Sequence, residues 1–257
     1  MIIQILENQF FSLKSQKDLR KIGKLYLGEV NKNKKKKINI LYVRFKYFIG
    51  KDFLKDYSKL KYIVSPTTGL DHIDIKFCKK KNIKILYLGN IKDKIKNIYS
   101  TADLCLGLIL SLARNINFSS KLFVKNNFLD RYNFITHDLR SQIVGIIGKG
   151  RIGSAIQNYL RLLKIKTLIV DINNKDNYKI KLKKLLMKAD IISINASVEN
   201  NRKIIDYKEI KIMKKGFKIV NTARSSLVNE NEIVKGIKNK QISGYATDVL
   251  ENENEPI

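Results

Sequence analysis

Short apolar runs alternate with longer amphipathic stretches along most of this 257-residue chain. In the N-terminal part, runs rich in β-branched residues predict strands at Ile2–Leu6, Ile38–Val43, Tyr62–Ser65 and Ile83–Leu88. Between them lie charged segments with helical periodicity, such as Ile49–Leu60 and Leu70–Asn82. Strands separated by helices are typical of parallel βαβ units, so the pattern predicts an α/β fold.

The same alternation restarts at Ile143. A long apolar helix is expected before it at Ser100–Asn115, followed by an irregular, polar stretch over 117–142 that we expect to connect two domains. Strand candidates then follow at Ile143–Gly148, Thr167–Asp171, Asp190–Asn195, Phe217–Asn221 and Ile242–Asp248. Amphipathic segments fill the gaps between them, which predicts a doubly wound parallel sheet.

The chain is strongly basic, with a formal net charge of +28. Such a charge is compatible with binding to nucleic acid or to an anionic membrane. However, the lysines are spread along the whole chain, and the one dense run, Lys32–Lys37, has the composition of a solvated loop. We therefore expect a compositional lysine bias with a general attraction for anions, and no nucleic-acid or membrane partner.

Cys78 and Cys105 lie in different segments and lack the spacing of metal ligands, so we expect two buried thiols in a reducing compartment and no metal site. The longest apolar run, Ala102–Arg114, is too short to cross a bilayer. The N-terminus has no basic region followed by a cleavage site. These features predict a cytoplasmic location.

The first chemical motif is the glycine pattern Gly148-x-Gly150-x-x-Gly153, which includes Arg151 and Ile152 and lies between a β-branched strand and an amphipathic helix. Gly148 can make the tight turn, Gly150 leaves room for a pyrophosphate, and Gly153 allows close helix–sheet packing. Main-chain N–H groups at the start of the helix would hold the phosphates. The motif therefore predicts a dinucleotide site.

Asp171 supports this interpretation because it ends the next strand, where a carboxylate can accept hydrogen bonds from both ribose hydroxyls. A carboxylate there would repel a 2′-phosphate, which favours NAD over NADP. Lys149 and Arg151 could still tolerate an additional phosphate.

Several motifs in order resemble those of the D-isomer-specific 2-hydroxyacid dehydrogenases, the family that includes D-3-phosphoglycerate dehydrogenase. The resemblance spans nearly the whole chain, and it rests on four segments: Ser65–Asp74, Ser100–Ile116, Gly145–Gly153 and Ala189–Glu253. It implies a smaller flavodoxin-like substrate domain at 1–99 and a Rossmann NAD-binding domain at 100–257. It also implies a 2-hydroxy or 2-keto acid substrate and a homodimer.

The resemblance assigns roles to residues of both domains. Arg224 matches the arginine that pairs with the substrate carboxylate and polarises the keto oxygen, and Asp248 matches the residue that orients the nicotinamide carboxamide. Other matches place residues along the cofactor at Thr68, Ala196, Thr222 and Ala223, and in the substrate site at Gly69 and Arg44. Arg44 is also compatible with a solvated arginine at a strand end.

Glu253 matches, by spacing, the glutamate that holds and tunes the family's catalytic histidine. Glu255 competes for this role because it precedes Pro256. The histidine itself would follow further along, so the chain resembles a version of the family that is truncated at the C-terminus. His72 and His137 are the only histidines, and we expect His72 to lie at a helix start or on the surface.

Two smaller departures concern the loops beside the cofactor. Asn195 and Ser197 replace the family's usual His and Pro, and Ser225 replaces the glycine that usually follows the arginine. The leading hypothesis is an NAD-dependent oxidoreductase for a D-2-hydroxy acid, whose activity truncation would impair. Two alternatives are a non-catalytic NAD-binding regulatory or corepressor-like protein and a pseudoenzyme fragment.

Overall fold

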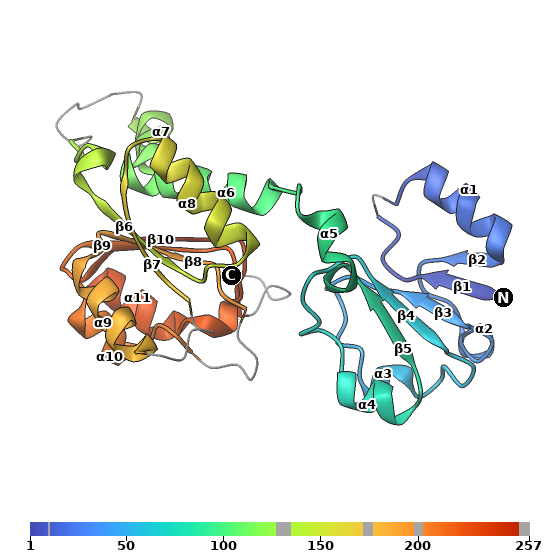
Figure 1. The fold of residues 1–257 in the computed structure, drawn as a ribbon. Coiled ribbons are helices and arrows are strands. Elements are labelled where there is room, and N and C mark those ends of the chain that lie inside the picture. The colour runs from blue at the N-terminus through green and yellow to red at the C-terminus, as the bar shows by residue number, and fades with distance from the viewer. Residues whose placement is uncertain (10, 127–134, 172–176, 198–202, 252–257) are drawn as a thin grey trace. The chain divides into compact units, whose positions relative to one another are not determined.

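The computed structural model describes residues 1–9, 11–126, 135–171, 177–197 and 203–251. The chain forms two compact units, Met1–Asn97 and Ile98–Ile257, here called unit 1 and unit 2. Each unit contains one five-stranded, wholly parallel sheet with helices on both faces (Figure 1). The prediction of an α/β fold with parallel sheets is therefore confirmed.

Unit 1 has the strand order β2-β1-β3-β4-β5. Its strands are β1 (Ile2–Ile5), β2 (Lys24–Leu27), β3 (Ile40–Tyr42), β4 (Tyr62–Ser65) and β5 (Lys84–Tyr87). Its helices are α1 (Leu13–Ile22), α2 (Lys32–Lys35), α3 (Lys51–Leu54), α4 (Ile75–Lys80) and α5 (Lys92–Ile95), with a 3-10 turn at Leu88–Ile91. This order is the flavodoxin-like one that the family resemblance implied.

Alternation along the strands of unit 1 builds one apolar layer on each side of the sheet. Ile3 and Ile5 face α1 together with Leu25, whereas Leu41 and Ile63 pack on the opposite face with residues of α3 and α4. Successive strand residues point to opposite faces, so buried strands carry apolar residues at nearly every position. The sequence analysis missed β2, and the run Lys32–Lys37 begins with a short exposed helix rather than a loop.

Unit 2 has the strand order β10-β9-β8-β6-β7. Its strands are β6 (Ile143–Ile147), β7 (Lys166–Val170), β8 (Ile191–Ile194), β9 (Phe217–Asn221) and β10 (Ile242–Thr247). Its helices are α6 (Ser100–Ala113), α7 (Ile116–Asn126), α8 (Arg151–Leu162), α9 (Tyr178–Lys188), α10 (Tyr207–Ile212) and α11 (Glu230–Lys238), with 3-10 turns at Leu139–Ser141 and Ser225–Leu227. All five predicted strands of this part of the chain are present within one residue of their expected ends.

The helices of unit 2 cover the sheet on both faces (Figure 1). Ala102, Cys105 and Ile109 of α6 pack with Ile156 and Leu160 of α8 against one face. Residues of α9, α10 and α11 bury the other face, among them Leu185, Leu186, Ile210 and Ile233. Burial on both faces explains the continuous apolar runs that identified these strands in the sequence.

One expectation about the middle of the chain was wrong. The stretch expected to be irregular begins as the helix α7, and it lies within unit 2 rather than between the units. Of the two positions expected for His72, the structure shows the helix start: His72 lies two residues before the N-cap of α4, Asp74, and only 8% of it is exposed. The two cysteines are buried and unbridged, as expected. Among the described residues, no helix is long and apolar enough to span a membrane.

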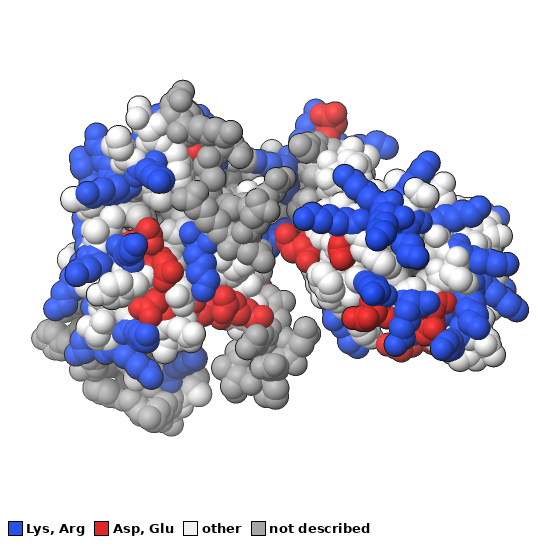
Figure 2. All heavy atoms as spheres, turned by 90° about the horizontal axis from the view of Figure 1, so that it is seen from below, with Lys and Arg blue, Asp and Glu red and all other residues white. Residues whose placement is uncertain are grey.

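Lysine and arginine side chains lie over much of the visible surface of each unit rather than in one patch (Figure 2). Acidic side chains are fewer and gather at a small number of places. This distribution agrees with the lysine spread in the sequence.

Candidate dinucleotide-binding site and substrate-domain loops

The reversal of strand order in unit 2 lies between β6 and β8, because the chain leaves β6 for β7 and then returns to β8 on the other side. In open α/β sheets, ligands bind at the carboxyl ends of the strands beside such a reversal. The loops at this point start at Gly148 and Asn195. The main-chain N–H of Asn195 donates to the carbonyl of Ile147 over 2.8 Å, which joins the two loops at their bases.

The glycine loop has the geometry that its spacing predicts. Gly148 has a φ of +103°, and a Cβ on it would lie 2.7 Å from the main chain of Asn195. A Cβ on Gly153 would lie 2.0 Å from the carbonyl oxygen of Gly148, whereas one on Gly150 would meet nothing within 4 Å. Only glycine fits at positions 148 and 153. The open space at position 150 can admit a ligand to the main chain.

Helix α8 begins directly after Gly150, which is its N-cap. The first N–H groups of a helix have no acceptor within the helix and carry the positive end of its dipole. They belong here to Arg151, Ile152 and Gly153, since the first hydrogen bond within the helix is donated by the N–H of Ser154 to the carbonyl of Gly150 over 2.9 Å. The side chain of Arg151 donates from Nη1 to the carbonyl of Ile98. This helix start is therefore suited to an anionic group.

Asp171 follows β7 and turns toward the glycine loop. Its Oδ2 accepts a 3.0 Å hydrogen bond from the main-chain N–H of Lys149. Gly148 donates in turn to the carbonyl of Val170 over 2.7 Å. The carboxylate is thus fixed next to the loop that would carry the phosphates.

The loop after β9 carries Arg224 and is shaped by a buried asparagine. The side chain of Asn221 is inaccessible to solvent. Its Nδ2 donates to the carbonyl of Arg224 over 2.8 Å, and its Oδ1 accepts from the N–H of Ala223 over 3.1 Å. The guanidinium of Arg224 donates from Nη1 to the carbonyl of Ala223 over 2.6 Å. Thr222 and Ala223 are buried.

Beneath the loop after β8, a thiol meets two polar side chains. The Sγ of Cys105 lies 3.2 Å from Oγ of Ser193, and Nδ2 of Asn195 donates to the same hydroxyl over 2.8 Å. Burial raises the pKa of the Cys105 thiol. Ala196 follows and is buried. The polar contacts of Asn195 are thus directed into the unit, where they hold the loop that carries Ala196.

Asp248 is exposed directly after β10. The hydroxyl oxygen of the preceding Thr247 lies 2.8 Å from the carbonyl oxygen of Asn221 and 2.8 Å from that of Val249, and it can donate its hydrogen to either. This contact ties the ends of β9 and β10 together. Glu253 and Glu255 lie outside the described residues.

In unit 1, the segment that carries Thr68 and Gly69 is held by a chain of side-chain hydrogen bonds. The Oγ of Ser65 lies 3.1 Å from Nε2 of His72 and 2.9 Å from Oγ1 of Thr67. Thr67 donates to the carbonyl of Gly69 over 2.6 Å. Thr68 itself is exposed at the tip. The histidine therefore has a structural position at the base of this loop.

Arg44 follows β3 and is exposed. The carboxylate of Glu7, which follows β1, accepts from the main-chain N–H of Arg44 and, over 2.9 Å, from that of Lys46. Glu7 thereby fixes the main chain from which Arg44 projects.

Sequence reasoning missed the residues that shape these loops, chiefly Glu7, Ser65 and Asn221. Each lies at or just beyond the carboxyl end of a strand, and each bonds to a main-chain group of a loop or to a loop side chain. These residues could have been found in the sequence as polar residues that end an apolar run. A buried polar group needs a hydrogen-bond partner, and the loop that follows the strand can supply it.

Two family models match the chain. Residues 9–149 match the D-isomer specific 2-hydroxyacid dehydrogenase catalytic domain, and residues 106–257 match the NAD binding domain of the same family. The second match identifies NAD as the cofactor of this chain.

Individual relatives agree with this match. A Staphylococcus aureus protein provisionally named a 2-hydroxyacid dehydrogenase is 32% identical over 216 residues, which cover 80% of this chain and 66% of that protein. A similarly named Staphylococcus haemolyticus protein is 30% identical, with 80% and 67% covered. The chain thus spans about two thirds of the length of these relatives.

Solved structures extend the agreement to the fold. The D-lactate dehydrogenase of Aquifex aeolicus, complexed with NAD and lactic acid, superposes with a TM-score of 0.84 at 25% identity and covers 98% of this chain and 78% of that one. An NAD-dependent formate dehydrogenase of S. aureus in complex with NAD gives 0.85 at 21% identity, covering 100% and 83%. The matches to both of its domains show that this chain belongs to the D-isomer specific 2-hydroxyacid dehydrogenase family.

Proposed function

We propose that the protein is an NAD-dependent oxidoreductase that interconverts a D-2-hydroxy acid and the corresponding 2-keto acid. The observation that carries this proposal is the glycine loop of unit 2, with the carboxylate of Asp171 fixed beside it by the N–H of Lys149 over 3.0 Å. The family membership and the lactic acid named in the A. aeolicus structure supply the substrate class.

The protein's own groups have distinct parts in this scheme. The helix start at Arg151, Ile152 and Gly153 holds the pyrophosphate, and Asp171 accepts hydrogen bonds from the adenosine ribose. Ala196, Thr222 and Ala223 line the cofactor through their main chain, Thr68 is a further cofactor contact, and Asp248 orients the carboxamide. When bound, NAD accepts or supplies the hydride.

Arg224 is the proposed catalytic group. Its guanidinium pairs with the substrate carboxylate and withdraws charge from the keto oxygen. Gly69 and Arg44 are further substrate-binding residues in this proposal. Glu253 stays a prediction as the match to the glutamate that holds the family's catalytic histidine, with Glu255 as the competing residue. A homodimer and a cytoplasmic location also stay predictions.

Calorimetry with NAD and NADH, followed by NADH oxidation with a panel of 2-keto acids, tests the proposal. We expect saturable NAD binding. Turnover should be slow, because no histidine of this chain matches the family's catalytic histidine and loss of a general acid typically costs about 10²- to 10⁴-fold in rate. The reverse reaction should accept only the D-enantiomer of the product. Failure to bind NAD at millimolar concentration would contradict the whole scheme. Binding without turnover of any acid would favour the non-catalytic NAD-binding alternative.

A further inference from the structure

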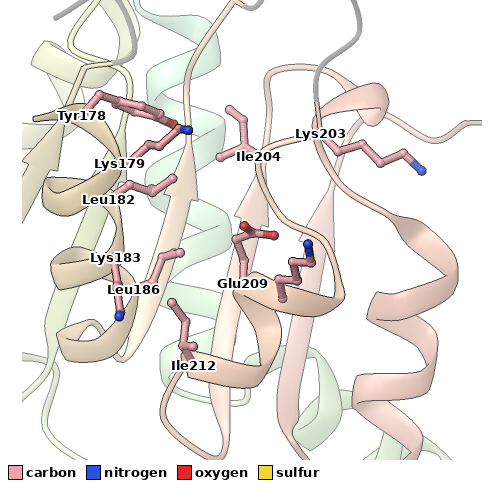
Figure 3. A pocket seen from close by; sticks show the side chains of 10 residues that line it. Tyr178, Lys179, Leu182, Lys183, Leu186, Lys203, Ile204, Glu209 and Ile212 are labelled. Atoms are coloured by element: carbon pink, nitrogen blue, oxygen red, sulfur yellow. The ribbon is translucent and has the colours of Figure 1, made fainter. Parts of the chain in front are cut away.

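Unit 2 contains a groove that the dinucleotide site does not use. It lies between α9 and α10 and encloses about 300 Å³ (Figure 3). Among the described residues that line it, none belongs to the glycine loop, to the loops after β8 and β9, or to Asp171. The lining comes from one face of α9, one face of α10 and the segment before α10: Tyr178, Lys179, Leu182, Lys183, Leu186, Lys203, Ile204, Lys208, Glu209 and Ile212.

The floor of the groove is apolar. Leu186 and Ile204 are buried beneath it, and Leu182 and Ile212 extend into it from opposite helices (Figure 3). Ile212 nevertheless keeps 37% of its surface exposed. An apolar group placed between these side chains would remove their exposed surface from water, which stabilises a complex by roughly 25 cal/mol per Å².

The rim of the groove is cationic. Lys179 and Lys183 rise from α9 and Lys208 from α10, and all three are exposed. Lys203 instead points away, toward the carboxylate of Glu251 at 4.0 Å. Among the described residues of the lining, the one carboxylate is Glu209, which accepts from the N–H of Asp206 over 3.1 Å as part of the capping box of α10. Lys208 is close enough to the carboxylate of Asp206 to interact with it electrostatically. In the part of the chain that the structure describes, the excess of positive charge at the rim therefore comes mainly from Lys179 and Lys183.

We propose that this groove binds a small organic anion with an apolar body, such as an aromatic or branched carboxylate or sulfonate. The body lies on Leu182, Leu186 and Ile212, and the anionic group lies at the rim beside the ammonium group of Lys183. The volume is at the lower end of the range of ligand pockets, about 300–1,000 Å³, so the ligand is much smaller than a dinucleotide. This inference is independent of the proposed catalytic function.

Titration with the fluorescent anion 1-anilinonaphthalene-8-sulfonate tests the proposal, with N-phenyl-1-naphthylamine as the neutral counterpart. We expect one saturable site for the anion. Lys183→Glu should weaken its binding roughly tenfold, a loss of about 1.4 kcal/mol. Lys184→Glu is the matched control, because Lys184 is the next residue of α9, is also exposed, and does not line the groove. It should change the affinity less than twofold.

A second pair tests the apolar floor. Ile212→Gln should weaken the binding of both the anion and its neutral counterpart, whereas Ile180→Gln on the exposed side of α9 should affect neither. Absence of a saturable site, or equal effects of Lys183→Glu and Lys184→Glu, would overturn the proposal. Complete displacement of the anion by saturating NAD would also overturn it, because the groove would then be part of the dinucleotide site.

Discussion

The main-chain N–H of Lys149 and the Oδ2 of Asp171 are joined by a 3.0 Å hydrogen bond, across the gap between the β6 and β7 loops. The bond links the turn that would carry phosphates to the carboxylate that would carry the adenosine ribose. Because one carboxylate oxygen is engaged by the main chain, the side chain is held in place before any ligand arrives. Such preorganisation lowers the ordering cost of binding.

Substitutions at Asp171 separate its charge from its geometry. Asp171→Asn keeps an acceptor for Lys149 but removes the negative charge, so it should reduce the preference for NAD over NADP with a moderate loss of NAD affinity. Asp171→Ala removes both and should weaken NAD binding by about 1.5–3 kcal/mol, the range for a hydrogen bond to a charged group. Calorimetric affinities for NAD and NADP measure both effects, and equal NADP binding by wild type and Asp171→Asn would contradict the assignment.

Two glycines of the loop should respond differently to alanine. A Cβ at position 153 would lie 2.0 Å from the carbonyl oxygen of Gly148, so Gly153→Ala should lower the free energy of unfolding by about 1–3 kcal/mol. A Cβ at position 150 meets nothing within 4 Å, so Gly150→Ala should fold normally but bind NAD more weakly. Urea unfolding and NAD titration of the pair distinguish the two roles. Unchanged NAD binding by Gly150→Ala would show that no ligand approaches there.

Replacing Arg224 should lower turnover strongly and change the affinity for NAD little. We expect Arg224→Gln to lower kcat/KM by roughly 10²- to 10³-fold, as for removal of a group that stabilises developing charge. Asn221→Ala should produce part of the same loss, since Asn221 Nδ2 fixes the carbonyl of Arg224 over 2.8 Å. Steady-state kinetics and NAD calorimetry on both variants are the measurement. Full turnover by Arg224→Gln would exclude the role that the family resemblance implies.

The sequence predicted the parts of this fold that depend on continuous apolar runs. All five strands of unit 2 were found because parallel strands buried on both faces carry apolar residues at most positions. The strand β2 was missed because it is a four-residue edge strand, Lys24–Leu27, that begins with an exposed lysine. Helix α7 was missed because its polar residues obscured its helical periodicity.

The candidate site was predictable where one residue type is required by local geometry. Gly148 and Gly153 belong to this class, since their spacing and their strand–helix context determine their roles. The partners that fix the loops were not predictable in the same way. The contact between Glu7 and Lys46, for example, joins residues 39 positions apart in the chain, and only the sheet brings them together.

The buried thiol of Cys78 should make the free energy of unfolding depend on pH in the alkaline range. Burial raises the pKa of Cys78 from 9.0 to about 11. Between these values the unfolded chain releases the proton that the folded chain keeps, so stability is complete below pH 9 and falls as the pH rises toward 11. Between pH 8 and pH 10.5 the loss should be about 2 kcal/mol. Urea unfolding of wild type and Cys78→Ala at both pH values isolates this difference, and equal losses in the two proteins would contradict it.

Ser65 should stabilise the loop around Thr68 through His72. The hydroxyl of Ser65 is buried and lies 3.1 Å from Nε2 of His72, so Ser65→Ala leaves a buried imidazole nitrogen without this contact. The expected cost is about 1–3 kcal/mol of unfolding free energy, together with faster hydrogen exchange of the main chain at residues 66–70. Ser58→Ala is a suitable control, because the hydroxyl of Ser58 donates to the carbonyl of Lys36 over 3.2 Å at an exposed position. Exchange rates at residues 66–70 that do not differ between the two variants would mean that the hydroxyl of Ser65 does not hold this loop.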